Sequence, residues 1–481
     1  MIITELQQLY ATHPNVEGMC KLLKDNSVRH LYCSGLCASA ASLFSSVLVQ
    51  QAECPFVFIL GDLEEAGYFY HDLTQILGTG QVLFFPSSFR RAIKYGQKDA
   101  ANEILRTEVL SRLQKGEEGL CVVTYPDALA EKVVSRKELG DKTLKLHVGE
   151  KVDMDFVTEV LRSYGFEYVD YVYEPGQYAV RGSIIDVFSF SSEFPFRIDF
   201  FGDEVESIRT FEVESQLSKE KKEEIVIVPD LSRSLEQGGN GGMVSFLDFL
   251  RPDTLLAMRD FLWLRERIQV VHDESLTAQA IAACEAEENG AISLEGKLID
   301  GGEFTLRALD FRRMEFGTKP TGTPDATVAF STVAQPIFHK NFDLVAESFR
   351  DYLSRNYTLY ICSDSLKQTD RIRAIFEDRG DNISFTPVER TLHEGFADDT
   401  LRLCIFTDHQ LFDRFHKYNL KSDKARSGKV ALSLKELNQF TPGDYVVHTD
   451  HGVGRFTGLV RIPNAVSYTH LRAHETTLHL V

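Results

Sequence analysis

The feature that most constrains the fold is a change of periodicity along the chain. Residues 1–147 alternate short buried apolar runs, such as 55–60 and 119–126, with segments of helical spacing. Around 165–230 the pattern becomes short strands of period two separated by tight turns. After 232 the alternation of apolar runs and helical segments returns. This order predicts an α/β domain with a parallel, helix-covered sheet that is interrupted by a small, antiparallel β-rich domain.

Two further units follow in the sequence. Strands are predicted at 357–364 and 401–409, and a segment rich in Lys, Ser and Asp then leads to a short helix and to strands within 443–459. A chain of 481 residues is long enough for about three or four domains. We place the boundaries at 1–147 and 232–330 for the interrupted domain, 148–231 for the β-rich domain, 331–425 for a second α/β domain, 426–440 for a linker helix, 441–463 for the start of a β-barrel and 464–481 for a tail.

Composition narrows the class of protein and its partners. The chain is 43% hydrophobic and 26% charged, and no apolar run reaches the ~20 residues that a bilayer requires. A formal net charge of −19 disfavours contact with a nucleic-acid backbone, and the basic stretches 90–94 and 417–435 are typical of a solvated loop and a linker. The eight cysteines lack metal-ligand spacing and no signal peptide is apparent. We therefore expect a cytoplasmic protein with free thiols, no metal site, no membrane contact and mainly protein partners.

Residues 31–45 have the frame of a phosphate-binding loop. Gly35 and Ser42 are in register with the pattern G-x-x-x-x-G-K-[ST], at the end of an apolar run and the start of a helical segment. Ala40 stands where the second glycine would let the backbone wrap phosphates, and Ala41 stands where a lysine would meet the β/γ oxygens. The frame by itself is equally compatible with coincidence.

A second position bears on the same question. P-loop motors end a strand in Asp-Glu, whose aspartate helps to hold Mg²⁺, and the candidate strand 255–258 is followed by Arg259 and Asp260. A guanidinium beside Mg²⁺ is repelled and supplies no ligand oxygen. We therefore expect a degenerate nucleotide site with no catalytic residues. Acids after the strand 56–60, including Asp62 and Glu65, are instead predicted to cap the next helix.

The β-rich domain contains a candidate protein-binding surface. In residues 197–201, alternation puts Ile198 and Phe200 on one face and Arg197, Asp199 and Phe201 on the other. A two-residue turn at 202–203 would start the return strand. If the first face is core, Phe201 is exposed near arginines, a composition typical of binding hot spots. The alternative is that both faces are covered and Phe201 belongs to the core.

Three long motifs carry a resemblance to a known family. They are EPGQYAVRGSIIDVF at 174–188, FPFRIDFFGDEVESIRTFE at 194–212 and GDYVVHTDHGVGRFTGL at 443–459. Together they resemble the N-terminal portion of the bacterial transcription-repair coupling factors, over residues 1 to about 463. The resemblance implies a UvrB-like α/β module with a degenerate P-loop, an inserted UvrA-binding domain, a variable α/β domain and the start of a CarD-like, Tudor/SH3-like barrel that binds RNA polymerase.

The resemblance also implies site residues and partners. By position in the motifs, UvrA contacts fall on Arg181, Arg197 and Phe201. Contacts with the RNA polymerase β subunit fall on Arg455, Phe456 and Ile462. In the family, a double-stranded DNA translocase follows, so ATP, Mg²⁺ and DNA are expected only through that motor, which is absent from this sequence. The expected function is an adaptor in transcription-coupled nucleotide excision repair.

Two alternative functions are also compatible with the sequence, and the sequence differs from the family pattern in one respect. The alternatives are an ATP-dependent DNA helicase or translocase subunit, disfavoured by Ala41 and Arg259, and a stand-alone CarD-like transcription regulator, disfavoured by the long UvrB-like region. The departure is the end of the sequence, VSYTHLRAHETTLHLV, which resembles translated sequencing-adapter sequence after a broken reading frame. Only two strands of the barrel would remain, too few to close it.

Overall fold

The computed structural model divides into two units, Met1–Asp423 and Lys424–Val481. The structure describes residues 1–25, 27–52, 54–88, 100–213, 215–231, 243–275, 296–418, 420, 443, 445–448 and 452–455. Several predicted features therefore lie outside the described residues: the basic stretch 90–94, most of the stretch 417–435, the linker helix 426–440, Phe456, Ile462 and the tail 464–481.

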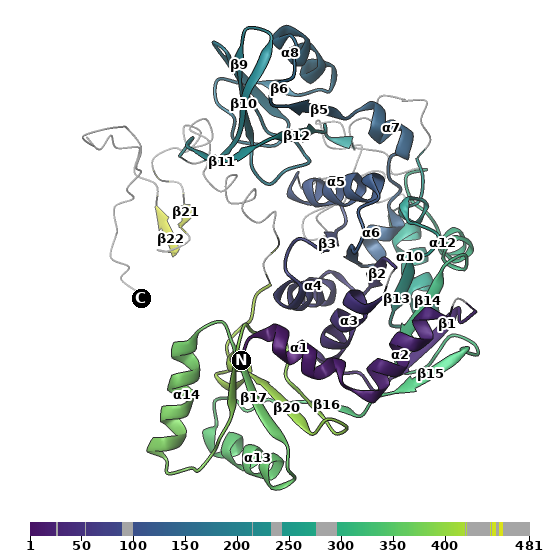
Figure 1. Cartoon of the computed structure of the whole chain (residues 1–481), viewed down its shortest axis with the longest axis vertical. Coiled ribbons are helices and arrows are strands. Elements are labelled where there is room, and N and C mark those ends of the chain that lie inside the picture. The colour runs from purple at the N-terminus through teal and green to yellow at the C-terminus, as the bar shows by residue number, and fades with distance from the viewer. Residues whose placement is uncertain are drawn as a thin grey trace. The chain divides into compact units, whose positions relative to one another are not determined.

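A seven-stranded sheet forms the centre of the first unit (Figure 1), with the order β15-β1-β14-β13-β2-β4-β3. Every neighbouring pair is parallel, as the alternation of apolar runs and helices predicts. The sheet combines strands from both sides of the β-rich insertion. Its strands are β1 (His30–Ser34), β2 (Phe56–Ile59), β3 (Val82–Phe85), β4 (Cys121–Thr124), β13 (Leu255–Met258), β14 (Arg312–Phe316) and β15 (Ala326–Ala329).

Helices cover this sheet, and side chains at their first turns explain where several begin. Asp62 accepts a hydrogen bond from the Glu65 amide at the start of α4, and Asp300 does the same for Glu303 at the start of α12. Helices α1 to α4 pack against one another, as do α6, α10 and α12. The helices are α1 (Ile3–Ala11), α2 (Pro14–Lys24), α3 (Ala40–Gln51), α4 (Leu63–Leu77), α5 (Ala100–Lys115), α6 (Pro126–Ala130), α7 (Arg136–Asp141), η1 (Phe246–Phe249), α10 (Phe261–Ser275) and α12 (Gly301–Ala308).

The β-rich domain, residues 144–227, has its own hydrophobic core. A six-stranded sheet has the order β11-β10-β9-β8-β7-β6, and β5 pairs with β12 separately. The sheet is not wholly antiparallel as predicted, because β6 runs parallel to β7 and the chain crosses over between them instead of making a hairpin. The elements are β5 (Leu144–His147), α8 (Met154–Ser163), β6 (Glu167–Tyr168), β7 (Gln177–Arg181), β8 (Ile184–Val187), β9 (Phe196–Phe201), β10 (Glu204–Phe211), β11 (Ser218–Lys222) and β12 (Glu224–Ile227).

The third domain, residues 332–411, contains a five-stranded mixed sheet with the order β16-β19-β20-β17-β18. Strand β17 is parallel to β18 and β20, whereas β19 is antiparallel to β16 and β20. The elements are β16 (Thr332–Ala334), α13 (Phe342–Ser354), β17 (Thr358–Ser363), α14 (Leu366–Asp378), β18 (Thr386–Glu389), β19 (Phe396–Asp398), β20 (Leu403–Thr407) and α15 (Asp408–Leu411).

Alternation along these strands gives the third domain two buried faces. Leu359 and Ile361 belong to a core that the domain builds with its own helices, whereas Tyr360 and Cys362 belong to the core of the parallel-sheet module. The Tyr10 hydroxyl also donates to Asp398 at 3.2 Å, which ties α1 to this domain. The third domain is therefore packed onto the module rather than connected by a linker alone.

The second unit is described only as a hairpin of β21 (Tyr445–His448) and β22 (Gly452–Arg455). Among the helices in the described part of the chain, none combines the length and apolar character needed to cross a membrane.

Candidate functional site

The loop between β1 and α3, where the phosphate-loop frame lies, is bonded to other parts of the protein. Gly35 has a positive φ of 77°, and a Cβ there would lie 1.9 Å from the Phe330 carbonyl oxygen. Thr332 Oγ1 donates to the Gly35 carbonyl at 2.6 Å and accepts from the Cys37 amide at 3.0 Å. Close packing against β15 and β16 thus accounts for the glycine without a nucleotide.

The start of α3 is in contact with the third domain. The Ser39 amide donates to the Glu394 carbonyl at 3.4 Å, and the Glu394 amide donates to Ser39 Oγ at 2.9 Å. The His393 amide donates to the Asp72 carboxylate of α4 at 2.7 Å. Backbone groups near the start of α3, where a phosphate would bind, therefore form hydrogen bonds with other residues of the protein.

A cavity of about 420 Å³ lies beside this loop. Ala41, Ser42 and Arg259 line it, so the structure brings both halves of the predicted nucleotide site to one place. Its acidic lining consists of Asp62, Glu64, Glu65, Asp72 and Glu394. Because five carboxyl groups face one arginine and one histidine, this cavity is a poor receptor for a triphosphate.

The charged groups of the cavity are also engaged locally. Arg259 forms an ion pair with Glu65 at 3.0 Å, and Asp260 accepts from the Trp263 amide at 3.0 Å as the first turn of α10 begins. Burial raises the pKa of Asp72 to about 7, although hydrogen bonds from Ser39, the His393 amide and Ser42 each lower that pKa. Ser42 and Asp260 thus have structural partners in place of a metal ion.

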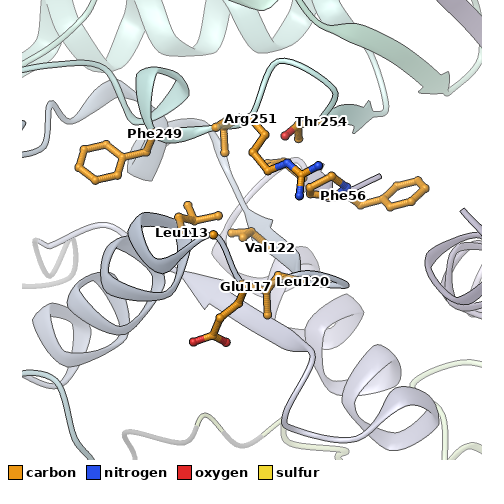
Figure 2. Close-up of a pocket in the computed structure, with 12 residues that line it drawn as sticks. Phe56, Leu113, Glu117, Leu120, Val122, Phe249, Arg251 and Thr254 are labelled. Carbon is orange, nitrogen blue, oxygen red and sulfur yellow. The ribbon is translucent and has the colours of Figure 1, made fainter. Parts of the chain in front are cut away.

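A second cavity lies where β2, β4 and β13 begin, between Leu113, Leu120, Val122 and Phe249 (Figure 2). Its volume is about 10 Å³, room for roughly one water molecule. It is too small to be a ligand site.

The β9–β10 hairpin has the predicted alternation. Ile198 and Phe200 are buried in the core of the β-rich domain, whereas Phe201 is 79% exposed. Gly202, with φ of 63°, makes the turn, and Glu204 pairs with Phe201 on the return strand. The alternative that Phe201 is a core residue is therefore wrong.

Arg181 lies at the same end of the sheet as Phe201. Strand β7 ends at Arg181, and the Phe200 amide donates to the Ser183 carbonyl in the turn that follows. The Arg181 guanidinium lies 5.0 Å from the centre of the exposed Tyr171 ring. An arginine and two exposed aromatic residues thus lie at this end of the domain.

Arg197 is placed differently from a free surface arginine. Its Nε donates to Asp186 Oδ1 at 2.8 Å and its NH2 donates to Oδ2 at 2.9 Å, while NH1 donates to the Gln216 carbonyl at 3.1 Å. Arg181 also pairs with Asp186. The side chain of Asp186 is 1% exposed, that of Arg197 16% and that of Arg181 35%. Arg197 therefore neutralises a buried carboxylate, and Arg181 has the more accessible charge.

Asp186 and Tyr171 were not singled out by the sequence. Asp186 is directly opposite Arg197 in the β8–β9 register, so an acidic residue within an otherwise apolar strand was the available signal. Tyr171 lies outside the predicted strand pairs, and no spacing rule linked it to Arg181.

The hairpin of the second unit contains one predicted polymerase contact. Arg455 is exposed and its Nε donates to the Gly443 carbonyl at 2.9 Å, while Tyr445, its cross-strand partner, is also exposed. Phe456 and Ile462 lie outside the described residues. The role of all three stays a prediction.

Comparison with protein families identifies two domain classes in the chain. Residues 144–232 match the UvrB interaction domain, and residues 440–478 match the CarD-like/TRCF RID domain. The second match continues into 464–478, residues that the sequence assigned to a tail. The chain thus contains two segments that are similar to these two domain families.

Curated relatives make the resemblance more specific. The chain is 23% identical to the transcription-repair-coupling factor of Bacillus subtilis (strain 168) over 513 residues, covering 92% of this chain and 43% of the relative. It is also 23% identical to that of Staphylococcus aureus (strain bovine RF122 / ET3-1) over 501 residues, covering 89% of this chain and 42% of the relative. The chain thus resembles the N-terminal part of transcription-repair-coupling factors and spans less than half of their length.

Proposed function

We propose that this protein is an adaptor in transcription-coupled nucleotide excision repair, which binds UvrA through the β-rich domain and the RNA polymerase β subunit through the segment that begins at 441. Homology to transcription-repair-coupling factors supports a role in this pathway. The two matched domain families support UvrA and RNA polymerase as partners, which would place the protein in the cytoplasm. The segment would start a Tudor-like barrel.

The observation that carries the UvrA proposal is the exposure of Phe201 beside a well-packed core. An aromatic side chain that is 79% exposed at a hairpin turn gains nothing from the fold of its own domain. Arg181 and Tyr171 at the same end of the sheet add the residue types that dominate binding hot spots. We propose Phe201 and Arg181 as direct contacts, and Arg197 as a contact that also supports the domain.

The test is a titration of UvrA with the full chain. Phe201→Ala should weaken binding by about 2 kcal/mol or more, roughly thirtyfold. Arg181→Ala should also weaken it, with a dependence on salt concentration because a charge is lost. Phe156→Ala is the matched control, because Phe156 is an exposed aromatic of the same domain on α8, which packs against the opposite, core face of the sheet. Unchanged binding by Phe201→Ala, or equal losses for Phe156→Ala, would reject this surface.

We also propose that the parallel-sheet module is a degenerate nucleotide-binding domain that does not hydrolyse ATP. The acid-lined cavity and the Arg259–Glu65 ion pair support this, as does alanine at position 41. ATP and Mg²⁺ would then be needed only by a separate motor. Mg²⁺-dependent hydrolysis by the purified protein that is abolished by Ser42→Ala would contradict the proposal.

A further inference from the structure

Three histidines outside the proposed partner surfaces lie together where the third domain meets α4. His393 precedes β19, His409 is in α15, and His416 is in the segment that leaves the third domain. One ring nitrogen of each lies within 4.8 Å of those of the other two. The rings of His409 and His416 are stacked, with centres 4.3 Å apart and an interplanar angle of 13°, and those of His393 and His416 are stacked with centres 5.8 Å apart at 24°.

Two ring nitrogens of this cluster have no hydrogen-bond partner among the described residues. They are the buried Nδ1 atoms of His393 and His416. His409 Nε2 lies 2.7 Å from the His393 carbonyl oxygen. Because a carbonyl only accepts, Nε2 holds the His409 proton, and Nδ1, which lies 3.5 Å from the Thr391 hydroxyl, is an acceptor. A backbone carbonyl that fixes the tautomer in this way is typical of metal-binding histidines.

A fourth imidazole lies next to the cluster. The ring centre of His71, on α4, is 4.9 Å from that of His416, and its buried Nε2 has no partner among the described residues. The charged groups that face the cluster are Asp364, Asp408, Glu394 and Arg414. Three carboxylates and one guanidinium leave an excess of negative charge for a cation.

We propose that His393, His409 and His416 bind a divalent transition-metal ion, with His71 or a water molecule as the fourth ligand. Imidazole nitrogens suit Zn²⁺, Ni²⁺ and Cu²⁺, whereas Mg²⁺ and Ca²⁺ prefer oxygen ligands. Metal–nitrogen bonds of about 2.0–2.1 Å put tetrahedral ligand nitrogens about 3.4 Å apart. Because the rings are stacked and each lone pair lies in the plane of its ring, the side chains have to turn about χ1 and χ2 before three lone pairs meet at one ion. The ion would fasten residues 412–418 to the third domain and to α4, independently of UvrA binding.

The experiment is calorimetric titration of the chelator-treated full chain with Zn²⁺ at neutral pH, repeated with Co²⁺ while visible absorption is recorded. One equivalent of Zn²⁺ should bind, and Co²⁺ should give the absorption of a four-coordinate nitrogen site. His416→Asn and His393→Asn should each weaken binding about tenfold or more. Thermal melts of the metal-free variants check that they remain folded.

The matched control is His339→Asn, since His339 is an exposed histidine of the same domain outside the cluster. It should bind Zn²⁺ as the unchanged chain does. Affinity of the unchanged chain weaker than about 100 µM would overturn the proposal. Equal affinity in the unchanged chain and in the His393→Asn and His416→Asn variants would overturn it too.

Discussion

The β-rich domain and the third domain are both small units attached to the same parallel sheet module, but they use their second sheet face differently. In the β-rich domain one face closes a separate core, and the other presents Phe201 and Arg181 to solvent. In the third domain both faces are buried, one in its own core and one in the core of the module. The first arrangement leaves a surface for a partner, whereas the second fixes a unit in place.

The largest expected effect concerns the core face of the β-rich domain. Ile198→Ala or Phe200→Ala should lower the local free energy of unfolding by about 2–5 kcal/mol through lost packing and the cavity left behind. Amide hydrogen exchange of β8, β9 and β10 in the full chain measures this locally. Faster exchange in the third domain as well would show that the two regions unfold together, which would break the comparison.

The second-largest expected loss of stability is that of the Arg197→Ala variant. Its loss leaves the buried Asp186 carboxylate with Arg181 as its remaining partner, so we expect a cost of about 1–3 kcal/mol to the β-rich domain. Arg181→Ala should cost less, since its side chain is more exposed. Comparison of hydrogen exchange with UvrA affinity separates the structural part of the effect from the binding part. Equal protection in the Arg197→Ala variant and the unchanged chain would mean that the pair is not structural.

Acidification should have a smaller effect, which lowers the stability of the third domain more than that of the β-rich domain. The folded-state pKa values of His71, His393 and His416 lie near 3–4, below the unfolded value, so their contribution is present above about pH 6.5 and is lost as pH falls toward 4. Asp72, with its pKa raised to about 7, acts in the opposite direction, stabilising as pH falls through 7. Burial also lowers the pKa of His409, which acts with these three histidines, and raises the pKa of Asp408, which acts with Asp72, so four histidines outweigh two aspartates.

We therefore expect exchange protection around β18, β19 and α15 of the chelator-treated, metal-free chain to decrease between pH 7 and pH 5, relative to the β9–β10 hairpin. Rates must be corrected for the intrinsic pH dependence of exchange. Equal protection in both regions across this range would mean that the buried histidines do not destabilise the third domain on acidification.

The smallest effect should be that of Phe201→Ala on stability. Because this side chain is exposed, the change should stay within about 0.5 kcal/mol of the unchanged chain in a thermal or denaturant melt. The same variant is the one expected to lose UvrA. A large loss of stability would mean that Phe201 packs against its own domain.

Periodicity predicted the parts of the fold that depend on local pattern. The parallel sheet and the alternation at Ile198 and Phe200 follow from spacing, whereas the exposure of Phe201 was one of two alternatives that spacing left open and the structure decided. Contacts between distant segments could not be predicted in this way. The pairing of Arg197 with Asp186 needed the strand register, and the meeting of His393 with α4 needed the docking of a whole domain.

The contact between Ser39 and Glu394 has a consequence for how this module behaves over time. Nucleotide-binding domains act as switches because the amides at a helix start are free in one state and occupied in another. In this protein the group bound at the start of α3 is Glu394 of the same chain. Because it is covalently linked, its effective concentration is high. On the function proposed above, a module held by this contact would have one resting state and would serve as a fixed frame for the partner-binding surface.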